Sequence, residues 1–212
     1  MNLYIPKHFK VDDLDEIKDF IIHNNFGTII TTDKNRPVAT HTPMMLNEEN
    51  GEWTITGHIS RGNTQWKMFD RHENTLLIFK GPHSYISSTW YEGENVPTWN
   101  YQSVHLYGQC VLLSEEELQQ DLVNLLEKYE GRSEGGATWE NLSESSKAQI
   151  KGIVGFKVKV QEIQAAYKMS QNRNETDHQN VVEALEVRNS DDDKKISREM
   201  RRIRKESESR RI

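Results

Sequence analysis

Residues 27–58 read GTIITTDKNRPVATHTPMMLNEENGEWTITGH, and this stretch decides the fold class. Its first segment, Gly27–Thr32, is short and rich in β-branched residues, and the turn-forming run DKNRP stops it. Val38–Met45 resumes the strand pattern. After a second turn at Asn47–Gly51, the residues from Trp53 to His58 alternate large apolar with polar side chains. The stretch therefore predicts three strands joined by tight turns, as in an antiparallel meander.

Further strand signals continue along the chain. Thr75–Phe79 is almost continuously apolar, which suits a strand covered on both faces. Ser84–Ser87 and Tyr101–Leu113 add two strands, and Val154–Val160 alternates cleanly as a late one. The sequence has no repeat at a fixed period. Short strands with tight turns and few helices predict an α+β, mainly β fold: a closed, antiparallel, Greek-key β-barrel with peripheral helices.

Helix signals are fewer and lie between the strands. Asp12 and Asp13 precede apolar residues at helical spacing, and Asn63–Arg71 predicts a brief helix. Ser114–Glu117 forms a capping box that opens an amphipathic helix, and Leu142–Ile150 is a weaker helix signal. We expect one barrel domain over residues 1–175, with a helical insert at about 114–151. A C-terminal helix and charged tail are expected over residues 176–212.

Charge is unevenly distributed along the chain. The net charge is −6, but residues 194–212 hold nine Lys or Arg and three Glu, so the preceding residues carry −12. Phosphate binding needs clustered cations, so only the segment Lys194–Arg211 is a candidate for DNA contact. This segment has the composition of a solvated or disordered tail. If it were helical, Ile196, Met200 and Ile203 would form a narrow apolar stripe that needs a partner to fix it.

Several functional classes lack their sequence signals. The single cysteine, Cys110, cannot form an intramolecular disulfide, and no signal peptide or membrane span is evident, so we expect a cytoplasmic protein without membrane contact. There is no phosphate-binding P-loop and no dinucleotide-binding Gly-x-Gly-x-x-Gly. The histidines do not form a His-Glu-x-x-His pair, so a zinc site is not expected.

One segment, His58–Trp66, combines groups that suit a phosphate monoester. It joins a strand end to a helix start and carries Ser60, Arg61, Asn63 and Gln65 beside the N–H groups of a helix N-terminus. The alternative interpretation is an ordinary capped turn, with Asn63 as the cap and Arg61 in solvent. The residues alone leave both interpretations open.

Two further segments bring histidines and aromatic residues toward the same region. His41 and Thr42 lie on a strand expected to run antiparallel to the one that ends at His58. Trp99, Tyr101 and His105 lie in another strand whose aromatic density suits stacking against a planar ring, although such density is also typical of a barrel core or a dimer interface.

Seven blocks of sequence, in this order, resemble the PaiB family of FMN-binding negative transcriptional regulators. The blocks are Tyr4–Phe9, Phe26–Thr28, Pro37–Pro43, Gly57–Trp66, Phe79–Ser87, Val96–Tyr101 and Lys168–Arg173, and the resemblance extends from residue 1 to about 175. It implies an FMN-binding split barrel that forms a homodimer with FMN at the subunit interface. It also implies a negative regulator of protease production and sporulation.

The resemblance implies roles for the candidate residues. The turn Ser60–Asn63, with Gln65 and Trp66 after it, would hold the FMN phosphate. The strand with His41 and Thr42, next to His58, would lie along the isoalloxazine ring. A second subunit would supply Trp99, Tyr101 and His105, and no residue is assigned a catalytic role.

Two other functions stay open beside the regulator. An FMN-dependent oxidoreductase related to pyridoxamine-phosphate oxidases would need no catalytic dyad, because the flavin itself performs the transfer. Haem is the less favoured cofactor, with His41, His58, His83 and His105 as available ligands. Against direct repression, the helices near 115–130 and 142–150 are too far apart for a helix-turn-helix.

Overall fold

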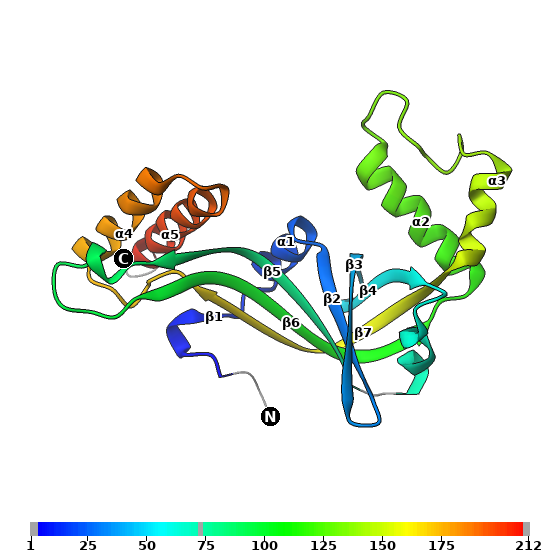
Figure 1. Ribbon diagram of the computed structural model, residues 1–212, viewed down its shortest axis with the longest axis horizontal. Helices are drawn as coiled ribbons and strands as arrows, with labels where there is room; N and C mark the ends of the chain where they lie inside the picture. Colours follow the sequence, from blue (N-terminus) through cyan, green and yellow to red (C-terminus); the bar gives the residue numbers. More distant parts are fainter. Residues whose placement is uncertain (1–3, 72–73, 210–212) are drawn as a thin grey trace. The chain divides into compact units, whose positions relative to one another are not determined.

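The fold is built on a seven-stranded antiparallel sheet (Figure 1). The computed structural model describes residues 4–71 and 74–209. The strand order is β1-β7-β4-β3-β2-β5-β6, and β6 also pairs with β7, so strands β2 to β7 close into a ring. The strands are β1 (Lys10–Val11), β2 (Phe26–Asp33), β3 (Arg36–Glu49), β4 (Glu52–Ser60), β5 (Thr75–Ile86), β6 (Thr98–Leu112) and β7 (Ile153–Lys168). The predicted mainly β barrel of the split-barrel type is confirmed.

Helices occupy the ends and connections of the strands. The α-helices are α1 (Leu14–His23), α2 (Glu115–Glu130), α3 (Glu144–Lys147), α4 (Glu175–Arg188) and α5 (Asp191–Ser209). Four 3₁₀ turns complete the elements of the described residues: η1 (Lys7–Phe9), η2 (Thr64–Arg71), η3 (Ser88–Trp90) and η4 (Ala148–Gly152). Within residues 4–71 and 74–209, no helix combines the length and apolar character needed to cross a membrane.

The two hairpins of residues 26–60 follow from their turn residues. Asp33 pairs with Arg36 across a two-residue turn whose residues, Lys34 and Asn35, both have positive φ (47° and 70°). The next hairpin turns at Asn50-Gly51, with φ of 53° and 81°. Positive φ at both turn positions gives a type I′ turn, which matches the twist of antiparallel strands. These turns fix the pairing register of the three strands in the predicted meander.

The chain divides into two compact units. The barrel unit comprises residues 18–79 and 105–163, and the helical unit comprises residues 1–17, 80–104 and 164–212. The expected boundary at residue 175 stays a prediction.

A fully buried apolar core fills the barrel unit. Its members come from β2, β4, η2, β5, β6 and β7: Ile29, Ile55, Phe69, Leu77, Phe79, Leu106, Phe156 and Val158. The predicted capping box opens α2, with Ser114 and Glu117 each bonded to the other's backbone N–H. Helix α2 is anchored further by the Tyr129 hydroxyl, which donates to Asn25 Oδ1 at 2.7 Å. The helix is thereby held against its own unit.

The helical unit packs α4 and α5 around a second buried core. Val181, Val182 and Leu185 of α4 are fully buried, as are Ile196 and Met200 of α5. Residues 191–209, which have the composition of a disordered tail, thus form a helix, and the predicted stripe at Ile196 and Met200 is its buried side. Arg202 and Glu206, four residues apart on α5, form an ion pair at 2.9 Å. Arg210 and Arg211 lie outside the described residues.

Two strands are longer than their sequence signals. We expected a break between Thr75–Phe79 and Ser84–Ser87, but β5 is continuous from Thr75 to Ile86. Strand β7 continues to Lys168, past the expected end at Val160. Strand pairing on both sides of β5 and of β7 accounts for the difference, because tertiary pairing overrides local turn signals such as Gly81-Pro82.

Candidate functional site

The turn from β4 into η2 presents a hydroxyl and a guanidinium to solvent. Ser60 and Arg61 are both exposed. The Gly62 N–H donates to Ser60 Oγ at 3.2 Å, and the Asn63 N–H donates to the Ser60 carbonyl at 2.9 Å. These bonds close the turn and fix Ser60 Oγ, whose hydroxyl proton can still be donated to a ligand.

Backbone carbonyls orient the Arg61 guanidinium. Its Nε–H donates to the Lys151 carbonyl at 2.9 Å, and Nη2 donates to the Ile153 carbonyl at 3.1 Å. Trp66 Nε1 donates to the Arg61 carbonyl at 3.0 Å, which fixes the backbone of the same residue. A guanidinium has five N–H groups, so several remain for an anion beside Ser60.

Asn63 and Gln65 are engaged inside the barrel unit. Asn63 Oδ1 accepts from the Gln65 N–H at 3.1 Å, so Asn63 is the cap that the alternative interpretation described. Its Nδ2 donates to Thr40 Oγ1 at 2.8 Å. Gln65 is 1% exposed, and its Nε2 donates to the Ile29 and Val38 carbonyls at 3.2 and 3.1 Å. These two amides hold the turn in place, and Ser60 and Arg61 are left to contact a ligand.

The strand with His41 and Thr42 presents its two side chains differently. His41 is exposed and stacks on Phe26, with the ring centroids 6.5 Å apart. Thr42 is buried, and its hydroxyl donates to the His58 carbonyl at 2.7 Å. Since Met45 pairs with Thr56, alternation along β3 and β4 puts His41 and His58 on the same face of the sheet. A ligand at this face would meet the His41 ring, while Thr42 fixes the strand spacing.

His58 lies beside a buried carboxylate that the sequence did not single out. Asp121 of α2 is buried and accepts a hydrogen bond from the Thr56 hydroxyl. Burial raises the Asp121 pKa, and burial lowers the His58 pKa against the opposing effect of Asp121. His58 Nδ1 is buried without a partner among the described residues. A carboxylate three residues after Leu118, on the apolar side of α2, was the signal that could have identified it.

The remaining candidates belong to different units. Trp99 and Tyr101 lie in the helical unit, 51% and 37% exposed, and the Trp99 ring stacks on His83 at 5.9 Å. The Tyr85 ring also packs edge-on to Trp99, with the ring centroids 5.9 Å apart. His105 lies in the barrel unit, where burial lowers its pKa.

The donor set at the turn fits the phosphate of a flavin mononucleotide. Ser60 supplies a hydroxyl and Arg61 a permanent positive charge, already oriented by bonds to Lys151 and Ile153. A Cβ added at Gly62 would meet only Ser60 Oγ, at 3.5 Å, so the backbone there is accessible to a ligand. His58 is expected to be neutral at pH 7 because its pKa is lowered, so it can act only as an uncharged partner.

Solved structures share this fold at low sequence identity. The flavocytochrome Anf3 from Azotobacter vinelandii is 15% identical, covers 83% of this chain and 78% of its own, and has a TM-score of 0.62. The FAD and haem binding protein from Mycobacterium smegmatis is 12% identical, with coverages of 75% and 73% and a TM-score of 0.58. At these identities the likeness shows the fold alone.

Proteins related in sequence identify the family of this chain. A family model described as "Putative FMN-binding domain" matches residues 3–162. The protein named "Protease synthase and sporulation protein PAI 2", from Bacillus subtilis, is 51% identical over 185 residues, which are 87% of this chain and 89% of the relative. By both the family model and this relative, the chain belongs to the PaiB family of proteins with an FMN-binding domain.

Proposed function

We propose that this chain binds FMN and acts in the cytoplasm as a negative transcriptional regulator of protease production and sporulation. The observation that carries the proposal is the 51% identity to a protein named for protease synthesis and sporulation. The match of the FMN-binding family model to residues 3–162 supports the flavin part. FMN would supply a redox-active, yellow ring system to the regulator.

In this proposal Arg61 and Ser60 hold the phosphate of FMN, and the strand with His41 lies along the ring. The protein acts as a homodimer, and Trp99, Tyr101 and His105 reach the flavin from the second subunit. The exposure of Trp99 and Tyr101 supports a covering partner, because monomers rarely leave grouped large aromatic side chains in water.

Replacing Arg61 with Gln is expected to weaken FMN binding by roughly ten- to a hundredfold. The substitution removes one charge-assisted contact to phosphate, which contributes about 1.5–3 kcal/mol. The readout is titration of FMN followed by quenching of its fluorescence. Lys67→Gln on the exposed side of η2 is the matched control and should leave the affinity unchanged. Equal affinity in both variants would remove Arg61 from the site.

The spectrum of the same samples separates the other two functions. A bound flavin that reduced nicotinamide bleaches and oxygen restores, with turnover, would support the oxidoreductase. A Soret band after addition of haem, without flavin binding, would support the haem protein. If the protein is a regulator, we expect it to bind flavin that does not react with reduced nicotinamide.

We propose that any direct DNA contact is made by α5. Because α5 is part of the core of the helical unit, substitutions on its surface are needed in place of a deletion. Deleting the tail would remove Ile196 and Met200 from the core of the helical unit, so loss of binding would have two explanations. Lys195 and Arg198 are exposed, whereas Arg201 and Arg202 lie in ion pairs. Exposed cations are therefore the ones to change.

The double variant Lys195→Gln/Arg198→Gln is expected to lower the slope of log affinity against log salt by about two on a labelled random-sequence duplex. Fluorescence anisotropy at several salt concentrations gives this slope. Lys34→Gln/Lys159→Gln removes two exposed cations from the barrel unit and should leave the slope as it is. An identical slope in all three proteins would exclude α5 as the contact.

A further inference from the structure

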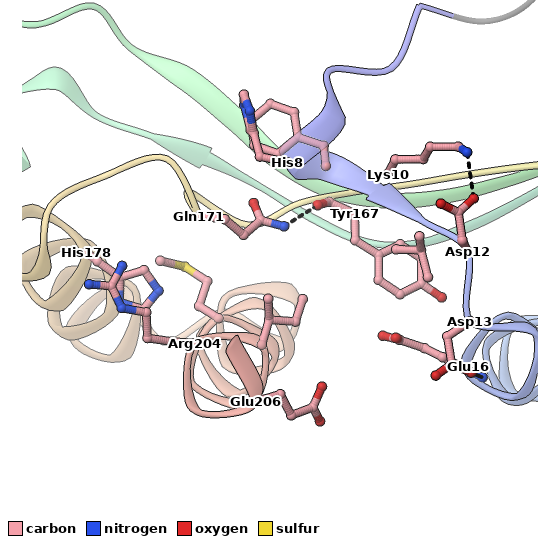
Figure 2. A pocket seen from close by; sticks show the side chains of 14 residues that line it. His8, Lys10, Asp12, Asp13, Glu16, Tyr167, Gln171, His178, Arg204 and Glu206 are labelled. Carbon is pink, nitrogen blue, oxygen red and sulfur yellow. Dashed lines mark hydrogen bonds and ion pairs between the residues drawn. The ribbon is translucent and has the colours of Figure 1, made fainter. Parts of the chain in front are cut away.

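The helical unit contains a cavity that none of the flavin candidates lines (Figure 2). Its volume is about 560 Å³, within the range of sites that hold small molecules. Helices α4 and α5, the end of β7 and the segment from His8 to Glu16 form its walls. The blocks Tyr4–Phe9 and Lys168–Arg173, which the flavin site does not use, contribute His8, Phe9 and Gln171.

Apolar side chains line part of this cavity. Phe9, Met200 and Ile203 line it together with the ring of Tyr167. Phe9 and Met200 are otherwise almost fully buried, so their positions are fixed by the core of the unit. Such a surface suits the apolar body of a ligand, with polar groups at the edges to orient it.

One end of the cavity carries an excess of negative charge. Glu16 and Glu206 both line it, and both bind the guanidinium of Arg202. Glu199 binds the same guanidinium at 2.9 Å, so three carboxylates share one positive charge and two negative charges remain. Asp13 adds a further carboxylate there, with Oδ1 accepting the N–H groups of Asp15 and Glu16. This end favours a cationic group on a ligand.

The other end carries cationic and imidazole groups. In Figure 2, His178 and Arg204 lie on the opposite side of the cavity from Asp13 and Glu16. Arg204 Nη1 donates to the Arg173 carbonyl at 3.2 Å, which orients the guanidinium. Lys10 is paired with Asp12 at 2.7 Å, so this ion pair adds no net charge. A guanidinium carries five N–H groups, so Arg204 can donate to a ligand carboxylate in addition to the Arg173 carbonyl.

We propose that this cavity binds a small zwitterion of dipeptide size, with its ammonium group at Glu16 and Glu206 and its carboxylate at Arg204. A dipeptide separates its two charges by a peptide unit, as the opposite ends of the cavity require, and its side chains would lie on Met200 and Ile203. The site is independent of the flavin, since no residue assigned to FMN lines it.

The first test uses three forms of one peptide on the full chain. Isothermal titration calorimetry compares L-alanyl-L-phenylalanine with its N-acetyl and its C-terminal amide forms. Each cap removes one charge, and each is expected to weaken binding by at least about tenfold. Equal affinity of all three, or no binding by any, overturns the proposal. A loss from only one of the two caps overturns the zwitterion in favour of a simple cation or anion.

The second test compares a carboxylate that lines the cavity with one that does not. Glu206→Gln should weaken binding of the free dipeptide by about tenfold and leave the N-acetyl form unaffected. Glu186→Gln removes a carboxylate from the ion pair with Arg201, and Glu186 does not line the cavity, so affinity should stay within about twofold. Equal losses in the two variants would overturn the assignment of the ammonium to Glu206. FMN affinity, measured in parallel, should be unchanged in both, so failure here leaves the flavin proposal standing.

Discussion

Replacing Gly108 with alanine is expected to destabilise the protein by about 3 kcal/mol or more. Gly108 lies on β6 where this strand passes β7, and a Cβ there would stand 2.0 Å from the Lys159 carbonyl oxygen and 2.8 Å from its carbon. Both atoms are backbone, so no flexible side chain can move aside. Because β6 pairs with β7 to close the ring of strands, relief of the clash would have to separate the closing pair.

Chemical denaturation of purified Gly108→Ala against the wild-type chain gives the free energy of unfolding that checks this. Gly152→Ala is the matched control in the same unit: nothing lies within 4 Å of its added Cβ, so stability should be equal or slightly higher. Wild-type stability in Gly108→Ala would mean that β6 and β7 are less closely paired than described.

The local elements of the barrel could be predicted because their signals are local. The turns at Lys34–Asn35 and Asn50–Gly51 carry residues that tolerate positive φ, and the capping box at Ser114–Glu117 marks the start of α2. The need for glycine at position 108 has no such signal. It depends on Lys159, about fifty residues later in the chain, and only strand pairing brings the two together.

The part of the candidate site that lies in one continuous segment could be predicted from the sequence. Residues 58–66 showed a strand end followed by a capped turn, and Ser60 and Arg61 are exposed there as a phosphate site requires. The sequence could not separate ligand groups from positioning groups. Gln65 is buried because β2 and β3 surround its amide, and Asp121 meets Thr56 only when α2 packs on β4.

The charged C-terminal segment shows how composition can mislead about order. Its high charge predicted a solvated tail. In the structure, Arg202 is surrounded by three carboxylates, and Ile196 and Met200 are buried against the rest of the helical unit. A narrow stripe on a charged helix is stable only where a partner surface exists, and the sequence of α5 alone does not contain that surface.

Asp193→Asn is expected to destabilise the protein by about 2–4 kcal/mol at pH 7. Asp193 is 1% exposed at the start of α5. Its carboxylate accepts from Arg188 Nε at 2.8 Å, from the Ser84 hydroxyl at 2.8 Å and from the Ser190 N–H at 3.2 Å. An amide in its place leaves the Arg188 charge unpaired. The Arg188 side chain is 38% exposed, so water limits the loss to less than a fully buried pair would give.

The pH dependence of stability gives the sharper test of the same residue. The hydrogen bond from Arg188 is the main reason that the pKa of Asp193 lies well below its usual range. A carboxyl with a lowered folded-state pKa stabilises the protein above the unfolded pKa of about 4, and this stabilisation is lost as pH falls toward the folded pKa. The stability gap between wild type and Asp193→Asn should therefore be greatest at pH 7 and should narrow at pH 3. The control is Asp191→Asn, in the same helical turn but with a 95% exposed carboxylate, and its stability should equal that of wild type at both pH values. If the stability difference between wild type and Asp193→Asn does not narrow at pH 3, the carboxylate charge of Asp193 is not the source of the effect.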